Sequence, residues 1–407
     1  MSNPVFLTRV ILKNYKSIAH CSVKLAPLNF LVGPNGAGKS NFLDALRLVT
    51  ESLNSSLDHA LRERGGISEV RRRSSGHPTH FAIELHFSLP DGTSGWYTFR
   101  VGSKEKGGFE VQEEKCRVSS EFPQECFFRV KSGHLKNSSA SVKPSVMPPA
   151  SEDRLYLFAA AGIPDFRPLY DALSRMGFYN LNPDEIRELQ PSDTGELLLR
   201  DGKNLASVLD LMKKENKASH ERVVEFLSKV VPGVLDVKAK HVGKKETLEF
   251  RQQVGRNKDL WRFLAENMSD GTLRALGVLT ALFQSGNGRG KKVPLVGIEE
   301  PEVAVHPGAA GVLRDALRAA AENTQVVVTS HSPDLLDDKS ISDEEILGVS
   351  NVNGETRIGP LNEADRSAIH ERLYTAGELL RMNQLTPDLQ NIKKRVSTPD
   401  LFKETKQ

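Results

Sequence analysis

Cysteine is scarce in this chain, with three residues among 407, and the three do not form a recognisable pattern. Cys21, Cys116 and Cys126 have neither a CxxC spacing nor histidines at the spacing of metal ligands, so they do not indicate a metal site. An odd number at irregular intervals also argues against a disulfide framework. We therefore expect a protein of a reducing compartment, the cytoplasm.

Long apolar segments are also lacking. The longest apolar stretches, such as the one at residues 325–329, have the length of a strand and fall far short of the roughly 18 residues that cross a bilayer. Residues 1–13 alternate as a strand does and do not resemble a signal peptide. We therefore expect no membrane span and no membrane partner.

The rest of the composition is that of a globular protein, with 38% apolar and 26% charged residues. The net charge of +3 is too small to identify a nucleic-acid binder by itself. A length of 407 residues favours two structural units, or one domain with a large insertion.

The spacing of apolar residues predicts an α/β core in two halves, separated by an insertion. The strands expected are 4–12, 20–32, several antiparallel ones within 80–130, a short β stretch at 234–251, and 293–298, 325–329 and 345–349. The helices expected are 39–54, 269–284, 307–322 and 363–381, with shorter ones inside a mainly helical insertion. Residues 131–153 read as an exposed loop. The predicted division is 1–154, the insertion 155–235, the second half 236–385 and a frayed tail 386–407.

Residues 33–40 read Gly-Pro-Asn-Gly-Ala-Gly-Lys-Ser and match the phosphate-loop pattern GxxxxGK[ST] in full, between an apolar strand and a helix. Glycines let backbone N–H groups turn toward phosphates, and the helix N-terminus adds partial positive charge. Lys39 can reach the β and γ phosphates of ATP, and the Ser40 hydroxyl can bind Mg²⁺. A plain glycine-rich turn is the alternative. The nucleotide-binding residues expected here are Asn35, Gly36, Ala37, Gly38, Lys39, Ser40 and Asn41.

Two strands of the second half end in residues suited to hydrolysis. The strand at 293–298 leads into Glu-Glu-Pro-Glu, where one carboxylate can hold Mg²⁺ and its neighbour can deprotonate the attacking water. We assign Glu299 to the metal and Glu300 to the water; an ordinary acidic turn is the alternative. The strand at 325–329 leads to His331, which we expect to contact the γ-phosphate, against the alternative of a surface or capping histidine.

The predicted helix at 269–284 opens with Ser269, Asp270 and Gly271. A serine hydroxyl and free N–H groups at a helix start suit an anion, and they suit a plain N-cap equally well. The local sequence leaves both open.

The order of these motifs resembles that of the ABC-type ATPase heads of SMC, RecF and OLD-family proteins. The opening Val-Ile-Leu-Lys-Asn-Tyr-Lys-Ser at 10–17 looks like their first strand, which implies that Lys16 lies near the nucleotide. The stretches Glu-Glu-Pro-Glu-Val-Ala-Val-His-Pro at 299–307 and Thr-Ser-His-Ser-Pro at 329–333 resemble the stand-alone OLD-like ATPases most. The resemblance implies an α/β ABC-ATPase head, with a mixed sheet, flanking helices and an antiparallel β lobe, into which the helical insertion is placed.

The resemblance also implies partners. Two protomers would sandwich two ATP molecules, with Ser269 and Gly271 on the γ-phosphate bound to the other subunit. Family members couple this clamp to DNA binding, DNA repair or defence against phage. OLD proteins carry a Toprim nuclease after the head, whereas only 76 residues follow His331 here. The resemblance therefore implies that an effector, a Toprim-type nuclease or a toxin, is a separate chain. The alternatives are a regulatory module that holds a toxin-like protein without binding DNA and, third, a transporter subunit.

Three departures from the family pattern stand out: Ser-Asp-Gly-Thr replaces Ser-Gly-Gly-Gln, Glu299 replaces aspartate, and no glutamine loop is evident. The glutamine candidates are Gln112, Gln124 and Gln190. Basic clusters follow the first helix, at Arg62, Arg64 and residues 71–73, and others lie at 213–214, 238–245 and 393–395. For the first cluster a solvated loop, DNA-backbone contact and an arginine near the nucleotide all remain open.

Overall fold

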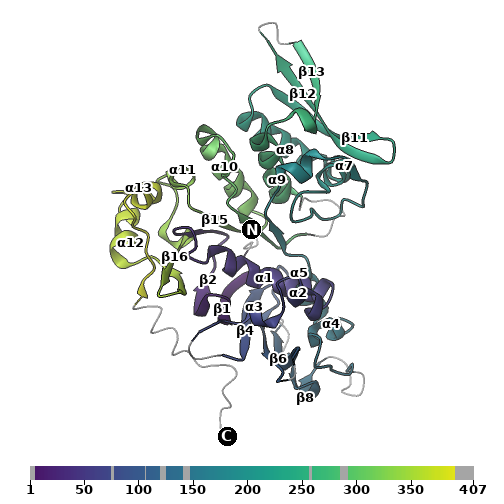
Figure 1. Cartoon of the computed structure of the whole chain (residues 1–407), viewed down its shortest axis with the longest axis vertical. Helices are drawn as coiled ribbons and strands as arrows, with labels where there is room; N and C mark the ends of the chain where they lie inside the picture. Colours follow the sequence, from purple (N-terminus) through teal and green to yellow (C-terminus); the bar gives the residue numbers. More distant parts are fainter. Residues whose placement is uncertain are drawn as a thin grey trace. The chain divides into compact units, whose positions relative to one another are not determined.

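The computed structural model describes residues 5–389, apart from 75–77, 106, 120–124, 141–146, 256–258 and 285–291. The chain forms two compact units, of which unit 1 comprises Met1–Ser174 and Lys339–Gln407, and unit 2 comprises Arg175–Asp338 (Figure 1). Unit 1 is therefore assembled from two parts of the sequence that are far apart.

An antiparallel sheet forms the larger part of unit 1, in the order β2-β1-β4-β5-β6-β7-β8. Alternating apolar residues give each central strand one buried face, as in β1, where Val10 and Leu12 are fully buried. The sheet is the antiparallel β lobe that the sequence predicts. Its strands are β1 (Leu7–Tyr15), β2 (Ile18–Lys24), β4 (His80–Ser88), β5 (Ser94–Ser103), β6 (Phe109–Ser119), β7 (Cys126–Lys131) and β8 (His134–Ser139).

A second group of strands in unit 1 carries the phosphate loop. Strand β3 (Leu28–Val32) is buried throughout and pairs in parallel with β16 (Ile346–Val352), which pairs antiparallel with β17 (Glu355–Pro360). The loop leads from β3 into α1 (Lys39–Asn54), whose apolar residues recur at helical spacing. The other helices of unit 1 are α2 (Leu57–Arg62), α3 (Ile67–Val70), α4 (Tyr156–Ala160), α5 (Arg167–Ser174), α12 (Glu363–His370) and α13 (Ala376–Arg381).

In unit 2, strand β14 (Leu295–Glu299) pairs in parallel with β15 (Gln325–Ser330) and with the short β9 (Gly177–Tyr179). Glu299 lies opposite Thr329 in this register, so the two strand ends that carry polar residues are adjacent. The helices of unit 2 are α6 (Pro183–Arg187), α7 (Leu205–Glu215), α8 (Lys217–Val230), α9 (Asp270–Phe283), α10 (Ala310–Ala321) and α11 (Pro333–Leu336).

A smaller antiparallel sheet completes unit 2 and lies beside α7 and α8 in Figure 1. Strand β12 (Lys245–Val254) pairs with β11 (Val234–Val242), with β13 (Asp259–Leu264) and with the two-residue β10 (Gln190–Pro191).

Several predicted elements differ from those observed. The strand expected at 20–32 is two strands, and the helix expected at 363–381 is α12 and α13, separated where Arg372 adopts a φ of 57°. Strand β8 lies within the stretch expected to be a loop, of which 141–146 fall outside the described residues. Strands β9 and β13 were not predicted, because β9 has three residues and β13 has no alternation of buried and exposed positions.

Two further expectations bear on the ends and the surface of the chain. The expected frayed tail falls largely outside the described residues, from 390 onward. Within the residues that the structure describes, no helix combines the length and apolarity required of a membrane span.

Candidate functional site

The phosphate loop closes around the side chain of Lys39. The lysine Nζ donates hydrogen bonds to the carbonyl oxygens of Gly33, at 2.7 Å, and Pro34, at 3.2 Å, and only 5% of the residue is exposed. Gly36 and Gly38 have φ values of 75° and 100°, which favour glycine. Helix α1 begins directly after the loop, at Gly38, so the partial positive charge of its N-terminus lies at the loop and favours an anion there.

Hydrogen bonds from distant parts of unit 1 support the back of the loop. Asn41 Nδ2 donates to Ser17 Oγ at 2.7 Å, and Thr356 Oγ1 donates to the carbonyl of Ala37 at 2.7 Å. Because the Thr356 hydrogen is used in this way, the 2.7 Å contact between the two hydroxyls requires Ser17 to donate to Thr356. The chain of donors therefore runs in one direction and ends on the loop backbone.

Two loop glycines are required by close packing on β16 and β17. A Cβ on Gly33 would lie 2.0 Å from the carbonyl oxygen of Val349, and one on Gly38 would lie 2.1 Å from Thr356 Oγ1. A Cβ on Gly36 would meet nothing within 4 Å. The sequence analysis did not find Ser17 or Thr356 as supports, since no local pattern marks them.

Lys16, expected near the nucleotide, is paired with Asp44 of α1 at 2.5 Å. The same carboxylate accepts from Tyr15 Oη at 2.8 Å and from Arg64 Nε at 3.0 Å, and the Arg64 side chain is 2% exposed. Burial alone would raise the pKa of Asp44, but the charges of Arg64, Lys16 and Arg47 hold it well below its usual range. Arg64 is thus a buried partner of Asp44, which excludes the solvated-loop and DNA-contact alternatives for this residue.

The turn at residues 299–302 in unit 2 holds Glu300 in an unusual conformation. Its φ is 45°, and its N–H donates to the Thr329 carbonyl at 3.0 Å. Arg274, 9% exposed, donates to the carbonyls of Glu299 and Glu300 at 3.3 and 3.2 Å. A non-glycine residue in this region of φ is strained, and the surrounding hydrogen bonds maintain it.

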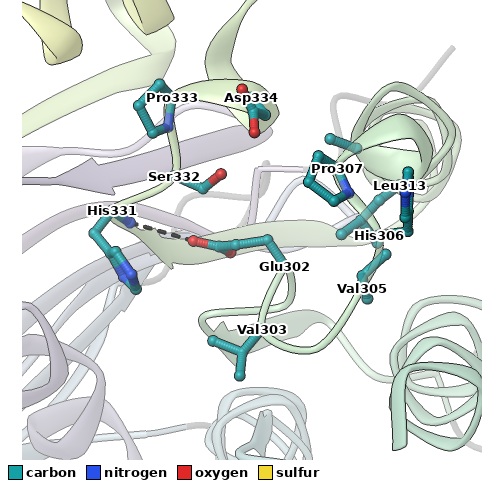
Figure 2. A pocket seen from close by; sticks show the side chains of 11 residues that line it. Glu302, Val303, Val305, His306, Pro307, Leu313, His331, Ser332, Pro333 and Asp334 are labelled. Atoms are coloured by element: carbon teal, nitrogen blue, oxygen red, sulfur yellow. Dashed lines mark hydrogen bonds between the residues drawn. The ribbon is translucent and has the colours of Figure 1, made fainter. Parts of the chain in front are cut away.

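Glu300 and His331 form a pair, with 3.2 Å between Glu300 Oε1 and His331 Nδ1. Glu302 holds the backbone beside them: its Oε1 accepts from Ser330 Oγ at 2.7 Å and from the His331 N–H at 3.3 Å, as the dashed line in Figure 2 indicates. A cavity of about 320 Å³, lined in part by Glu302, His331 and Asp334, opens beside this contact. No role was predicted for Glu302 from the sequence.

Glu299, expected to bind Mg²⁺, is paired with Arg200 at 3.0 Å. Carboxylate and hydroxyl oxygens are the hard ligands that Mg²⁺ prefers, so Glu299 and Ser40 fit the ion chemically. Arg200 Nη2 donates to Oε1, one of the two carboxylate oxygens of Glu299. Arg200 is a second residue that the sequence did not identify.

Ser269 caps α9, because its Oγ accepts a hydrogen bond from Thr272 N at 3.3 Å. Asp270 is paired with Arg187. A Cβ on Gly271 would lie 2.2 Å from the carbonyl oxygen of Ala304, so the helix start packs closely on the segment after the acidic turn. The local contacts are therefore those of an N-cap, and the role of Ser269 and Gly271 toward a phosphate stays a prediction.

Two of the glutamine candidates lie in described parts of the chain. Gln190 donates to the carbonyl of Glu185 at 3.0 Å, and the Gln112 amide lies 3.5 Å from Glu110 Oε1. Gln124 falls outside the described residues. These contacts assign neither residue to a glutamine loop.

Two family models match the chain. Residues 6–122 match a family described as "AAA ATPase domain", and residues 168–337 match one described as "AAA domain, putative AbiEii toxin, Type IV TA system". The two matches fall on the two halves that carry the phosphate loop and the acidic turn.

Curated relatives include OLD nuclease of Thermus scotoductus, 25% identical over 378 residues, which is 89% of this chain and 66% of that protein. RecF of Vibrio vulnificus is 43% identical over 44 residues, 11% of this chain and 12% of that protein. The chain thus spans slightly under two thirds of the OLD nuclease and a small part of RecF.

Among solved structures, an SMC head bound to the C-terminal winged-helix domain of ScpA has a TM-score of 0.55 at 14% identity. The aligned region covers 88% of this chain and 99% of the chain in that structure. An SMC head from Pyrococcus furiosus, bound to the C-terminal domain of ScpA, has a TM-score of 0.54 at 13% identity, with 90% and 99% covered. This likeness confirms the predicted α/β head fold.

Proposed function

We propose that this chain, which is similar to ABC-type ATPases of the SMC, RecF and OLD class, hydrolyses ATP with Mg²⁺ as a dimer with shared sites. The ATP state would gate DNA binding, a separate effector chain, or both, in defence against phage or in DNA repair. The observation that carries the proposal is the pairing of Glu300 with His331 at the end of two adjacent strands, in a chain with a complete phosphate loop.

In this proposal each residue has a chemical task. The loop N–H groups and Lys39 would hold the triphosphate, while Ser40 and Glu299 would hold Mg²⁺, which would neutralise charge on the phosphate oxygens. Glu300 accepts a proton from the water whose oxygen attacks the γ-phosphorus. The bond between the γ-phosphorus and the β–γ bridging oxygen breaks, and ADP leaves with that oxygen as phosphate is released. His331, oriented through its contact with Glu300, donates to the γ-phosphate.

Ser269 and Gly271 are proposed to contact the γ-phosphate held by the other protomer. The effector is proposed to be a separate Toprim-type nuclease or toxin, and the similarity to a protein named as a nuclease favours a nuclease. A second candidate function is a regulatory module that holds or releases a toxin-like partner without binding DNA. The match of residues 168–337 to a family described by a toxin–antitoxin system favours it.

The solution mass of Glu300→Gln with and without ATP and Mg²⁺, by light scattering, tests the dimer. Glu300→Gln should bind ATP, turn over at least about 100-fold more slowly and double in mass with nucleotide. Lys39→Ala is the control, which should neither bind ATP nor change in mass. Wild-type turnover in Glu300→Gln would refute the assignment of the base.

Ser269→Arg tests the shared site separately. The residue is exposed at the start of α9, so the substitution should leave the fold intact while its bulk blocks a neighbouring protomer. We expect ATP binding to persist and hydrolysis to stop. Normal hydrolysis by Ser269→Arg would show that one chain suffices.

A further inference from the structure

The small sheet of unit 2 carries basic side chains on one face. In the register of β11, β12 and β13, Lys238 lies opposite Glu249, and Arg251 lies opposite Arg262. Alternation along β11 adds Lys240 to the same face. We call Lys238, Lys240, Arg251 and Arg262 the basic face.

The other face of this sheet is covered within unit 2. Val237 and Phe250 are fully buried there, and Ser207 of α7 donates a hydrogen bond to Glu246 of β12. Helices α7 and α8 both contact β11, as Figure 1 shows. The basic face is on the opposite side, where the side chains of Lys238, Lys240 and Arg262 are 46%, 45% and 70% exposed.

One carboxylate organises three of these cations. Glu249 lies 3.2 Å from Lys238, 3.0 Å from Lys240 and 3.9 Å from Arg262, and its side chain is 7% exposed. The hydrogen bond from Lys240 is the main reason that the pKa of Glu249 is lowered. A single negative charge thus fixes cations from two strands and leaves their charge in excess.

The arginine pair is unfavourable without an anion. Arg251 and Arg262 are direct cross-strand partners, and like charges in this position destabilise a sheet. The side chain of Arg251 makes no ion pair or hydrogen bond with the described part of the chain. The carboxylate across from it on β11, Asp236, is paired with Lys213 at 3.6 Å. Glu249 therefore neutralises the arginine pair only in part, through its 3.9 Å contact with Arg262.

We propose that the basic face binds the phosphate backbone of double-stranded DNA. Its cations are spaced about 5 Å apart across the strands and about 7 Å apart along them. A polymer with evenly spaced negative charges can contact several of these cations at once. Each guanidinium group can donate two parallel hydrogen bonds to phosphate oxygens. The inference gives a location to the DNA binding in the proposed function and rests on that part of it.

Fluorescence anisotropy with a labelled 30-base-pair duplex, without nucleotide, measures this binding in the full chain. Four phosphate contacts predict affinity about 100-fold weaker at 200 mM than at 50 mM salt. Arg251→Gln with Arg262→Gln leaves two contacts, so the loss over the same range should fall to about tenfold. Arg251→Lys with Arg262→Lys keeps the charges and should restore most of the wild-type salt dependence.

The matched control is Lys217→Gln with Lys229→Gln, two exposed cations of α8 that lie off the basic face. This control should bind as wild type does. Equal salt dependence in wild type and in Arg251→Gln with Arg262→Gln would overturn the proposal, as would poly-glutamate binding as tight as that of a duplex of equal charge. The anisotropy assay contains no ATP, so its result does not depend on ATP hydrolysis. A lack of ATPase activity in a separate assay would refute the proposed hydrolysis and leave the result on DNA binding unchanged.

Discussion

Glu114 on β6 provides a pH-dependent test of unit 1. Its side chain is fully buried, and it accepts hydrogen bonds from Tyr97 Oη at 2.9 Å, from Leu157 N at 2.8 Å and from Tyr156 N. Burial raises the pKa of Glu114 to about 7, although the three donors oppose the rise. The carboxyl group thus anchors the start of α4 to the β lobe.

The sign of the effect on stability follows from the two states. Below the unfolded pKa of 4.5, Glu114 is protonated in both the folded and the unfolded state, so its burial does not require a charge to be desolvated. Between 4.5 and about 7 the unfolded chain loses the proton while the folded chain keeps it, so the free energy of unfolding decreases. For this single group the decrease between pH 5 and pH 8 is about 2–3 kcal/mol.

Urea unfolding of wild type and Glu114→Gln at pH 5 and pH 8 measures this quantity. Glutamine keeps the size and one acceptor oxygen but does not ionise, so its free energy of unfolding should lack this component. We expect the wild type to lose about 2–3 kcal/mol more than Glu114→Gln over the interval. Parallel pH profiles would show that Glu114 is ionised in the folded protein.

Three substitutions test the remaining contacts of unit 1. Gly38→Ala combines a φ of 100° with a clash against Thr356, so it should cost about 2–4 kcal/mol by urea unfolding and abolish ATP binding; Gly36→Ala, with open space, should cost about 1 kcal/mol. Thr356→Val leaves a loop carbonyl without its donor, which should cost about 1–3 kcal/mol and weaken ATP binding in a titration, whereas the serine variant should bind ATP as wild type does. Arg64→Met should cost about 1–3 kcal/mol because Asp44 loses its most buried cation and keeps Lys16 and Arg47. Arg62→Met, at a side chain 77% exposed, should change stability by less than about 0.5 kcal/mol. A small effect at Gly38 or Arg64, measured in the same denaturation series, would contradict the packing described.

The local parts of the site could be predicted from sequence because their signals are local. A strand, a glycine-rich turn and a helix follow one another at residues 28–54, and this order is observed. Strand ends carrying Glu299 and His331 were likewise predicted from apolar runs, and the register places the two strand ends side by side.

The supports of the site could not be predicted because they depend on tertiary register. Thr356 reaches the phosphate loop only because β17 follows β16, which pairs with β3. Two of the three interpretations left open for Arg64 are excluded by its burial, which a sequence does not show. The pairing of Arg200 with Glu299 joins residues 99 positions apart, and no local pattern marks either partner for the other.

The hydroxyl contact between Ser17 and Thr356 joins residues separated by 339 positions. During synthesis at about 5–20 residues per second, the hairpin that backs the loop follows Lys39 by on the order of 15–60 seconds. Throughout that interval the nascent chain has the phosphate-loop sequence without the partner that fixes its backbone. The ability to retain ATP is therefore acquired late, and a ribosome stalled before the β17 hairpin would carry a chain that the nucleotide cannot yet stabilise.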